Sequence, residues 1–484
     1  MQEWKARPDR LPLIVKGARQ VGKTECVRHF AEGRYASFVE INFDLQPEFR
    51  VITRDGYSAE NILRNISLIE PNFRFIENNT LIFFDEIQDF PEIATCFKSF
   101  AQQGKYDVIS SGSLLGIQFR RIESISVGFQ ETAMMHSLDF EEFLAARGYR
   151  ANQLDELYGH LLEGRAFGEA ANTTFDRLFL DFSTLGGMPE VVERYFVKGT
   201  FEGVPAIQRR IVNDYRSDVR KYAEGLDPVR IVNVFDSIPG QLAKENKKFQ
   251  LSHVEKKARY KDYWGCVEWL ADAGIVNVCK AMDFPELPVA AHLDALCFKL
   301  YMADSGLLIS MLDEESQEDV RLRRNLGTWK GGLFENIVAE ALVKSGVEPV
   351  YYKKENSTLE MEFFLRSGDD LVPVEVKAGN TKAKSLRTLL DSAHYKDIRW
   401  GIKLVRGNVG FDKGVLTVPQ WCAFFLRRLT KEPSLMFSRT NCPGKAFLIA
   451  RGASTAISYD AELIFLLYKT LYMIFTYPTI YIIT

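Results

Sequence analysis

The segment Gly17–Thr24, with the sequence GARQVGKT, constrains the fold of this chain more than any other. It follows LPLIVK, an apolar run typical of a buried strand, and precedes ECVRHFAEG, which is typical of a helix. Glycines in such a loop let successive backbone N–H groups turn toward one anion at a helix N-terminus. The spacing GxxxxGK[ST] therefore predicts a phosphate-binding loop between a strand and a helix of a parallel sheet.

Each position of this loop is a candidate nucleotide-binding residue: Gly17, Ala18, Arg19, Gln20, Val21, Gly22, Lys23 and Thr24. We expect Lys23 to neutralise the β and γ phosphates of ATP during binding and catalysis, and Thr24 to ligate Mg²⁺. The alternative is a glycine-containing turn that matches the motif by chance, which the flanking strand and helix disfavour.

A second apolar run, TLIFFDE, ends in Asp85 and Glu86. A buried parallel strand delivers the side chains at its carboxyl end to the ligand edge of the sheet. We expect Asp85 to contact the nucleotide site and hold the water shell of the metal, and Glu86 to polarise the attacking water as the catalytic carboxylate. A solvated strand end is the alternative.

Hydroxyl groups end a further predicted strand, YDVISSGS, and two arginines follow it. Ser111 or Ser113 would either touch the γ-phosphate or cap the strand end. Arg120 and Arg121 are candidate catalytic cations, acting in the same chain or on a neighbouring subunit. The alternative for both is an ordinary surface arginine.

The 484 residues exceed what one hydrophobic core normally holds, and 46% hydrophobic with 26% charged residues is a globular composition. The hydrophobic pattern predicts a multidomain α/β protein. Its predicted parts are a phosphate-loop unit at 1–148, a helical connector at 149–228, a winged-helix-like unit at 229–312, a small α/β unit at 313–428 and an atypical apolar tail at 429–484.

The formal net charge of −3 does not call for nucleic acid, so any basic surface must be local. Seven scattered cysteines without a CxxC pair argue against a disulfide framework and against a zinc site. The apolar run LPLIV near the N-terminus is too short for a signal-peptide core. We therefore expect a cytoplasmic protein.

A local basic surface is predicted between Lys244 and Lys261, where seven basic residues face two acidic ones. A helix-turn-helix unit with a positive approach surface could bind the phosphates of duplex DNA. The alternative is a solvated lysine-rich face. The basic residues are Lys244, Lys247, Lys248, Lys256, Lys257, Arg259 and Lys261.

A second acidic cluster is predicted near the C-terminal end. In LVPVEVKAG, Glu375 and Lys377 share one strand face, and the preceding strand LEMEFFL places Glu362 nearby, with Glu335 added from a helix that we expect to be amphipathic. Glu335, Glu362 and Glu375 are candidate Mg²⁺ ligands, and Glu375 and Lys377 are candidate catalytic residues for metal-assisted phosphodiester cleavage. An edge hairpin with exposed charges is the alternative.

Together, GARQVGKT, LIFFDEIQ, ISSGSLLG and SLDFEEFLAARG resemble the AAA+ superfamily ATPases whose C-terminal part is called domain of unknown function 4143. LGGMPEVV, QLAKENKKF, FKLYMADSGLL, KGGLFEN and VPVEVKAG extend the resemblance over roughly residues 4 to 420. It implies an ATP-binding module with Mg²⁺, a winged-helix-like middle and a C-terminal domain like the PD-(D/E)XK nucleases. Glu362 stands where an Asp is usual in those nucleases, which puts cleavage in doubt.

Leu463–Thr484 is almost wholly apolar and long enough for one membrane span, but Lys469 and Pro478 argue against a simple span. Membrane contact by this tail and homo-oligomer formation both stay open. We expect a Mg-dependent ATP-hydrolysing protein whose nucleotide state repositions a DNA-contacting, nuclease-like region. The alternative is a non-catalytic, NTP-dependent switch that binds a protein partner and carries an inactive nuclease-like domain.

Overall fold

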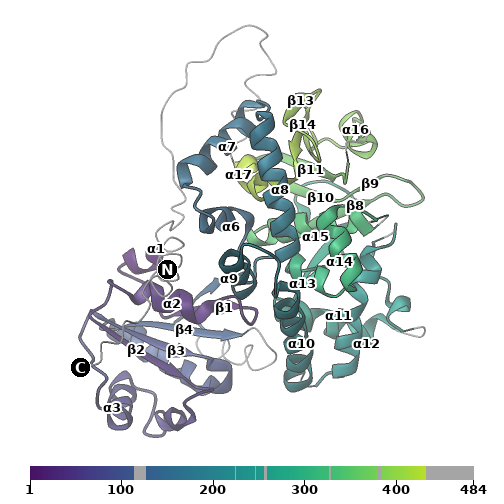
Figure 1. The fold of residues 1–484 in the computed structure, drawn as a ribbon. Helices are drawn as coiled ribbons and strands as arrows, with labels where there is room; N and C mark the ends of the chain where they lie inside the picture. Colours follow the sequence, from purple (N-terminus) through teal and green to yellow (C-terminus); the bar gives the residue numbers. More distant parts are fainter. Residues whose placement is uncertain are drawn as a thin grey trace, which may run out of the picture.

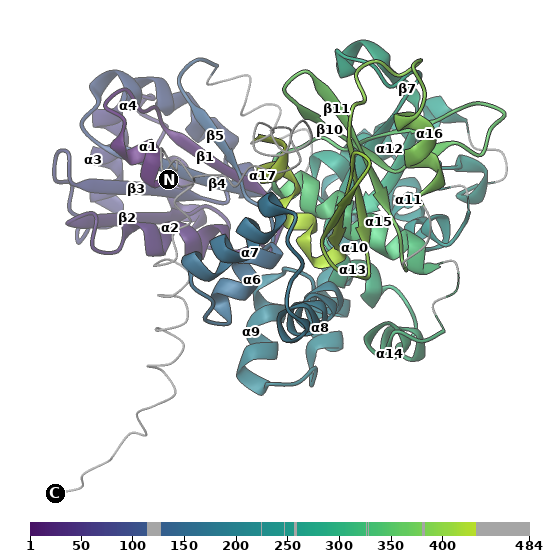
Figure 2. The same cartoon turned by 90° about the horizontal axis from the view of Figure 1, so that it is seen from above.

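The computed structural model describes residues 1–431 except 114–126, 224, 246, 256–258, 326, 328 and 380–382. One α/β body lies at the N-terminal end and a larger body of helices and two mixed sheets forms the C-terminal half, with a group of helices between them (Figure 1). The view in Figure 2 shows the same division from above. The predicted multidomain α/β class is confirmed.

The N-terminal body is a five-stranded sheet in the order β2-β3-β4-β1-β5, and all four strand pairs are parallel. Parallel neighbours require crossover connections, which here are helical or irregular segments that cover the sheet. Its elements are α1 (Gln2–Ala6), β1 (Leu13–Gly17), α2 (Lys23–Ala31), β2 (Ser37–Asn42), α3 (Ala59–Ile69), β3 (Thr80–Asp85), α4 (Phe97–Gln103), β4 (Asp107–Ser113) and β5 (Glu131–Met134), with 3-10 helices η1 (Pro47–Val51), η2 (Ile87–Asp89) and η3 (Pro91–Cys96).

Both faces of this sheet are buried, which explains the unbroken apolar runs of its central strands. Every residue of β1, β3 and β4 is buried. One face packs Ile82 and Phe84 of β3 with residues of α3 and α4, and the other packs Leu81 and Phe83 with residues of α2. The core thus holds the carboxyl ends of β3, β4 and β1, in that order, along one edge of the sheet.

A set of helices follows β5: α6 (Phe140–Ala146), α7 (Ala151–Glu163), α8 (Glu169–Leu185), α9 (Pro189–Lys198) and α10 (Val204–Tyr222). Helix α6 begins with a capping box in which Asp139 accepts from the backbone N–H of Glu142 and Glu142 accepts from that of Asp139. Helix α8 runs against the C-terminal half, where Trp421 packs on Phe167 and Phe175. These helices therefore join the two bodies through an aromatic core.

The described middle of the chain forms helices α11 and α12, a β-hairpin and a short helix, α13, after it. Strands β6 and β7 are antiparallel, and β6 also pairs in parallel with β8, so that the second sheet has the order β7-β6-β8-β9. This sheet joins strands from both sides of residue 312, where we predict a boundary; the unit boundaries stay predictions. The elements are α11 (Pro228–Leu242), η4 (Leu251–His253), α12 (Tyr260–Asp272), β6 (Val276–Met282), η5 (Val289–His292), β7 (Leu293–Met302) and α13 (Ser305–Ser310).

The third sheet has the order β10-β11-β12-β14-β13, with an antiparallel β10–β11 hairpin and parallel β11–β12 and β12–β14 pairs. The predicted strand LEMEFFL is interrupted at Glu362, between β9 and β10. The elements are α14 (Glu314–Leu322), α15 (Trp329–Lys344), β8 (Val350–Lys353), β9 (Glu360–Met361), β10 (Phe363–Ser367), β11 (Asp370–Val376), α16 (Lys384–Leu390), β12 (Gly401–Val405), β13 (Gly410–Asp412), β14 (Val415–Pro419), η6 (Gln420–Phe425) and α17 (Leu426–Lys431).

Helix α15 is expected from its sequence to be amphipathic, but the structure buries it on all sides. Residues 332–342 are all buried, including the polar side chains of Glu335, Asn336 and Glu340. Each of these finds a partner: Asn336 bonds the backbone of Met302, and Glu340 accepts from the N–H of Ser305. Asn336 and Glu340 therefore anchor this central helix to the end of β7 and the start of α13.

Three segments, around residues 137–138, 185–187 and 304–306, meet at a glycine-rich junction. A Cβ added to Gly187 would overlap the carbonyl of Leu138, and one added to Gly306 would overlap the carbonyl of Leu185. Asp304 accepts from Ser137 Oγ and from the N–H of Gly187, both at 2.8 Å. Because only glycine permits these approaches, LGGMP and ADSGLL fix how the units meet.

No helix within the described residues is long and apolar enough to cross a membrane. The apolar tail from Leu463 to Thr484, with Lys469 and Pro478, lies outside the described residues. A cytoplasmic location stays a prediction.

Candidate functional site

The phosphate loop joins β1 to α2 at the carboxyl edge of the N-terminal sheet, as its sequence predicts. Gly22 adopts φ 91° and Gln20 adopts φ 64°, both in the left-handed region. Gly17 lies so close to the backbone of Met135 that a Cβ would overlap its carbonyl oxygen. The two glycines of the motif, Gly22 and Gly17, are therefore required by backbone conformation and by close approach, respectively.

Lys23 lies inside this loop and is only 6% exposed. Its ammonium donates to the carbonyl oxygens of Gly17 and Ala18, at 3.2 and 2.9 Å. Burial lowers the pKa of Lys23, and the carboxylates of Glu86 and Asp85 oppose that shift. An ammonium held only by two carbonyls is well placed to exchange them for phosphate oxygens.

Asp85 at the end of β3 is 1% exposed and accepts three hydrogen bonds from different elements. Thr24 Oγ1 donates at 3.0 Å and Asn42 Nδ2 at 2.9 Å to its Oδ2, and Ser111 Oγ donates to its Oδ1. Burial raises the pKa of Asp85, while the bond from Ser111 opposes this. A hydroxyl and a carboxylate in contact suit Mg²⁺, which takes oxygen ligands and keeps several waters.

Asn42 is a site residue that the sequence motifs did not indicate, although it ends the strand FVEINF that pairs with TLIFFD. Ser111, which we considered as a γ-phosphate sensor or strand cap, bonds Asp85 in this structure. Ser113 donates its backbone N–H to Gln88 Oε1 at 3.2 Å.

Glu86 follows Asp85 with a left-handed backbone, φ 54° and ψ 47°. Such a conformation is uncommon for a residue with a Cβ and is concentrated at functional sites. Gln88 Nε2 donates to the Glu86 carboxylate and, at 3.2 Å, to Asp89. Gln88 thus ties the Glu86 side chain to the end of β4 through Ser113, a role not foreseen from the sequence.

The crest of the loop is held by helix α10. Arg19 Nη1 bonds Asp218 Oδ1 at 2.5 Å and Arg19 Nη2 donates to Tyr222 OH at 3.0 Å, while Gln20 Nε2 donates to Asp214 Oδ2 at 2.8 Å. Tyr215 OH donates to the carbonyl of Arg19 at 3.1 Å. These partners lie about 200 positions along the chain, which is why the loop sequence alone does not indicate them.

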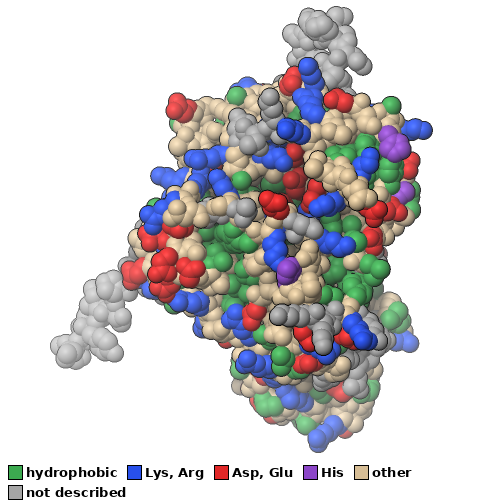
Figure 3. Space-filling view, turned by 90° about the vertical axis from the view of Figure 1, so that its right-hand side faces the viewer, with side chains coloured by type: hydrophobic (Ala, Val, Ile, Leu, Met, Phe, Trp, Pro, Cys, Tyr) green, Lys and Arg blue, Asp and Glu red, His purple; other side chains and the backbone are tan. Residues whose placement is uncertain are grey.

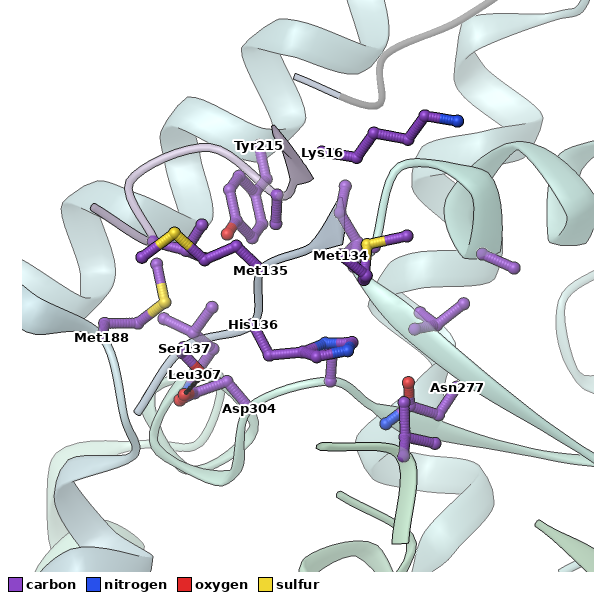
Figure 4. Close-up of a pocket in the computed structure, with 18 of the residues that line it drawn as sticks. Lys16, Met134, Met135, His136, Ser137, Met188, Tyr215, Asn277, Asp304 and Leu307 are labelled. Atoms are coloured by element: carbon purple, nitrogen blue, oxygen red, sulfur yellow. Dashed lines mark hydrogen bonds between the residues drawn. The ribbon is translucent and has the colours of Figure 1, made fainter. Parts of the chain in front are cut away.

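A cavity of about 430 Å³ adjoins the loop, and Figure 4 shows His136 pointing into it from the segment after β5. Ala18 and Val21 of the loop line it together with Met135, Met188, Tyr215, Asn277 and Asp304. Burial, with a contribution from Lys344, lowers the pKa of His136 to about 4, so the imidazole is neutral near pH 7. The lining is mainly apolar, and its polar groups include the charged side chains of Lys16, Asp272 and Asp304.

In the C-terminal half the structure brings together the four predicted residues Glu335, Glu362, Glu375 and Lys377. Lys377 Nζ lies 2.8 Å from Glu375 Oε1 and 3.7 Å from Glu362 Oε1. The second carboxylate oxygens of Glu362 and Glu375 are buried without a hydrogen-bond partner among the described residues. Burial, with the nearby charge of Glu335, raises the pKa of Glu362 to about 7, and Lys377 opposes this.

Two lysines from the middle of the chain also enter this cluster. Lys247 Nζ lies 2.8 Å from Glu335 Oε1, and Lys299 Nζ, 1% exposed, lies 3.5 Å from Glu335 Oε2 and 2.8 Å from Glu360 Oε1. Tyr301 OH donates to Glu335 Oε2 at 3.1 Å. Glu335 is therefore fully engaged by protein donors, unlike Glu362 and Glu375.

Within the described part of the chain no group of three or more His, Cys, Asp or Glu side chains is arranged to hold a metal ion. The unpartnered carboxylate oxygens of Glu362 and Glu375 are donors of the kind that Mg²⁺ takes. The three-carboxylate Mg²⁺ site predicted with Glu335 stays a prediction.

The predicted basic surface is partly internal. Lys247 pairs with Glu335, and Lys248 Nζ lies 2.9 Å from Cys297 Sγ. Arg259 is exposed and Lys244 half-buried. Lys256 and Lys257 lie outside the described residues, as do the side chain of Lys261 and the candidate arginines Arg120 and Arg121. On the face shown in Figure 3, positive and negative side chains are interspersed.

Three sequence families match parts of the chain. Residues 9–144 match the AAA domain, and this segment holds the phosphate loop, Asp85 and Glu86. The N-terminal unit is of the AAA type. Residues 176–318 and 330–421 match two domains of unknown function, DUF8612 and DUF4143. The AAA match makes this unit similar to nucleotide-binding ATPases, and the DUF4143 match agrees with the resemblance that the sequence motifs carry.

No curated protein matches the chain. Among solved structures, the Aeropyrum pernix Orc1 protein in complex with DNA is 12% identical with a TM-score of 0.27, covering 65% of this chain and 87% of that one. Drosophila ORC bound to DNA is 12% identical with a TM-score of 0.24, covering 64% and 91%. A Pyrococcus horikoshii STAND protein with a tetratricopeptide repeat sensor is 11% identical with a TM-score of 0.20, covering 72% and 45%. We infer nothing about ligands from similarities this low.

Proposed function

We propose that this protein is a Mg²⁺-dependent ATPase whose nucleotide state is transmitted from the AAA unit to the C-terminal half. The observation that carries the proposal is the meeting of Lys23, Thr24, Asp85 and Glu86 at one edge of the N-terminal sheet. Lys23 would bind the β and γ phosphates, and Thr24 with Asp85 would hold Mg²⁺. Bound Mg²⁺ would neutralise phosphate charge as the γ-phosphoryl group leaves.

Glu86 is the proposed catalytic carboxylate. It would accept a hydrogen bond from the attacking water and orient it, and the bond from Gln88 holds the Glu86 side chain. Asp85 accepts three hydrogen bonds, which suits a carboxylate that holds the metal in a fixed position. Glu86 is bonded by Gln88, which suits a carboxylate that orients the attacking water.

The nucleoside part of ATP would occupy the cavity beside the loop. Its apolar lining, with Met135 and Tyr215, suits a flat base, and neutral His136 and Asn277 could form hydrogen bonds with the base edge. Residues from β5, α10 and β6 line this cavity together, so a bound nucleoside would contact both the AAA unit and the middle of the chain.

We further propose that the C-terminal half acts on duplex DNA. The β6–β7 hairpin after α11 and α12 has the order of a winged-helix unit, and Lys244 and Arg259 would contact phosphates. The route from the AAA unit runs through the glycine-rich junction, where Ser137 and Gly187 bond Asp304. The proposed coupling is compatible with a homo-oligomer in which an arginine of one subunit reaches the nucleotide site of the next subunit.

ATP hydrolysis by the full chain, measured with and without duplex DNA at several salt concentrations, tests the proposal. We expect Mg²⁺-dependent turnover, stimulation by DNA, and DNA affinity that falls steeply with salt because phosphate contacts release counterions. Absence of hydrolysis with retained ATP binding would leave a switch without ATPase activity. DNA affinity that does not depend on salt would contradict the DNA contact.

One observation favours the alternative of a protein-binding switch with an inactive nuclease-like domain. Lys247, Lys299 and Lys377 compensate the carboxylates of the C-terminal cluster without a metal. Calorimetric titration of the full chain with Mn²⁺, together with a nicking assay on supercoiled plasmid, separates the cases. Binding with nicking supports a nuclease, binding alone supports an inactive centre, and no binding at millimolar Mn²⁺ excludes a metal site.

A further inference from the structure

Helix α10 presents one side chain per turn to the crest of the phosphate loop. Asp214, Asp218 and Tyr222 are spaced by four residues, so they lie along one face of the helix. Their partners are Arg19 and Gln20, which lie in the middle of the loop between β1 and α2. The loop that is predicted to bind a polyanion is thus held in this structure by two carboxylates.

Asp218 has no other strong partner for its charge among the described residues. It is 4% exposed, its Oδ1 bonds Arg19, and its Oδ2 lacks a hydrogen-bond partner within the described part of the chain. A buried carboxylate that depends on one guanidinium is costly to leave unpaired. Arg19 can therefore turn toward a second anion only at the expense of this bond.

Arg19 also lies close enough to Glu86, the proposed catalytic carboxylate, for the two charges to interact. Burial lowers its pKa, but Asp218, Tyr222 and Glu86 together hold it above its ordinary value. The guanidinium is thus always charged, and Glu86 is near enough to act on it. A guanidinium in this place suits the terminal phosphate of a triphosphate, because it forms paired hydrogen bonds to phosphate oxygens.

We propose that Arg19 is a movable phosphate ligand that distinguishes ATP from ADP, and that Asp218 with Tyr222 is its resting partner. This inference rests on the proposed nucleotide binding. When Arg19 turns to the terminal phosphate, it leaves Asp218, and α10 loses its main bond to the loop. Since Arg216 on α10 bonds Asp236 on α11 at 2.8 Å and Arg209 bonds Glu314 on α14 at 2.7 Å, release of α10 is felt by the C-terminal half.

Binding of MgATP and MgADP to the full chain, measured by calorimetry, tests this assignment. We expect Asp218→Asn to tighten MgATP binding about tenfold and MgADP binding much less, because the bond that competes for Arg19 is weakened. Arg19→Ala should weaken MgATP binding about tenfold, and Asp218→Asn should have little further effect in that background. Glu190→Gln, which breaks an exposed ion pair with Arg210 of α10 that has no part in the proposed coupling, is the control and should leave both affinities unchanged.

The outcomes separate this inference from the proposed function. Unchanged or weaker MgATP binding by Asp218→Asn overturns the resting-partner role, as does equal tightening in the Arg19→Ala background, which would reveal a general charge effect. If Asp218→Asn fails to fold, Tyr222→Phe replaces it, because this change removes one hydrogen bond from Arg19 without altering a buried charge. MgATP binding that tightens about threefold supports the assignment, and unchanged MgATP binding overturns it. Wild-type protein that binds MgATP no better than Lys23→Ala overturns the proposed function and this inference together.

Discussion

Thr24 on α2 donates its hydroxyl to Asp85 at the end of β3, with 3.0 Å between Oγ1 and Oδ2 and 61 positions between them in the chain. This bond joins the two segments that the sequence marks for nucleotide chemistry. Asn42 and Ser111 bond the same carboxylate, so side chains from three further elements hold Asp85 in place. Preorganisation of this kind limits the rearrangement that metal binding requires.

Lys23→Ala should abolish MgATP binding and leave the fold intact. The substitution removes a buried ammonium whose hydrogen bonds, within the described residues, go to two carbonyls, so no apolar core contact is lost. We expect affinity to fall by about 100-fold or more, and the melting temperature to stay equal or rise, because burying a charge is costly. Calorimetry and thermal melting measure these quantities. Unchanged ATP affinity would remove the phosphate-loop assignment.

Glu86→Gln should keep MgATP binding and slow hydrolysis by about 100-fold or more, since an amide fits the space but cannot accept a proton from water. Steady-state phosphate release and equilibrium binding separate the two effects. Glu32→Gln, at an exposed position after α2, is the control and should hydrolyse ATP at the wild-type rate. Wild-type turnover in Glu86→Gln would assign the role to another residue.

Gly187→Ala should destabilise the protein by at least about 2 kcal/mol, because its Cβ would overlap the Leu138 carbonyl at the junction. Gly159→Ala in α7 is the matched control: nothing lies within 4 Å of its added Cβ, and alanine favours a helix by about 1 kcal/mol. Thermal melting should move in opposite directions for the two variants. Equal melting temperatures would contradict the close approach.

His136 should make the protein less stable in mild acid. Burial, with Lys344, lowers its pKa in the folded chain to about 4, whereas an unfolded His titrates near 6.5. Between these values the unfolded chain binds a proton that the folded chain does not, so stability is full above about pH 6.5 and is lost as the pH falls toward 4. Melting temperatures at pH 7.5 and 5.0 should differ less in His136→Gln than in the exposed control His253→Gln. The same difference in both would exclude this role.

Lys299→Met should cost about 3–5 kcal/mol, because it leaves buried Glu335 and half-buried Glu360 with less compensating charge. Lys353 provides a close comparison, since it lies 3.2 Å from the same Glu360 but its side chain is 39% exposed. Lys353→Met should cost less than about 1 kcal/mol. Denaturant unfolding followed at several wavelengths would show whether the two variants differ as expected.

The parts of the site that the sequence predicts are those in which strand, loop and helix are contiguous. Gly17–Thr24 and Asp85–Glu86 each follow an apolar strand directly, so local pattern is enough to place them at the sheet edge. Asp214 and Asp218 reach the same loop only through packing of α10, about 200 positions away. Nothing in the local pattern of NDYRSDVRKY distinguishes these acids from solvated ones.

The sequence gives a weaker indication of two other residues, Asn42 and Lys299. Asn42 ends a strand next to TLIFFD, and strand adjacency would have placed it beside Asp85. Lys299 stands within the apolar strand CFKLYM, where a charged residue needs a buried partner. The break of LEMEFFL at Glu362 and the burial of α15 on all sides depend on the neighbouring sheets, which periodicity does not report.

The pairing of β6 with β8 has a mechanical consequence. Backbone hydrogen bonds, which are less easily exchanged than side-chain contacts, continue from the hairpin of the middle segment into the strands beside the acidic cluster. The middle and C-terminal segments thus share one continuous sheet. Separating them near residue 312 would expose an unpaired strand edge on each fragment. Under the proposed coupling, a displacement of α10 would therefore move the basic segment and the acidic cluster together, because both adjoin this sheet.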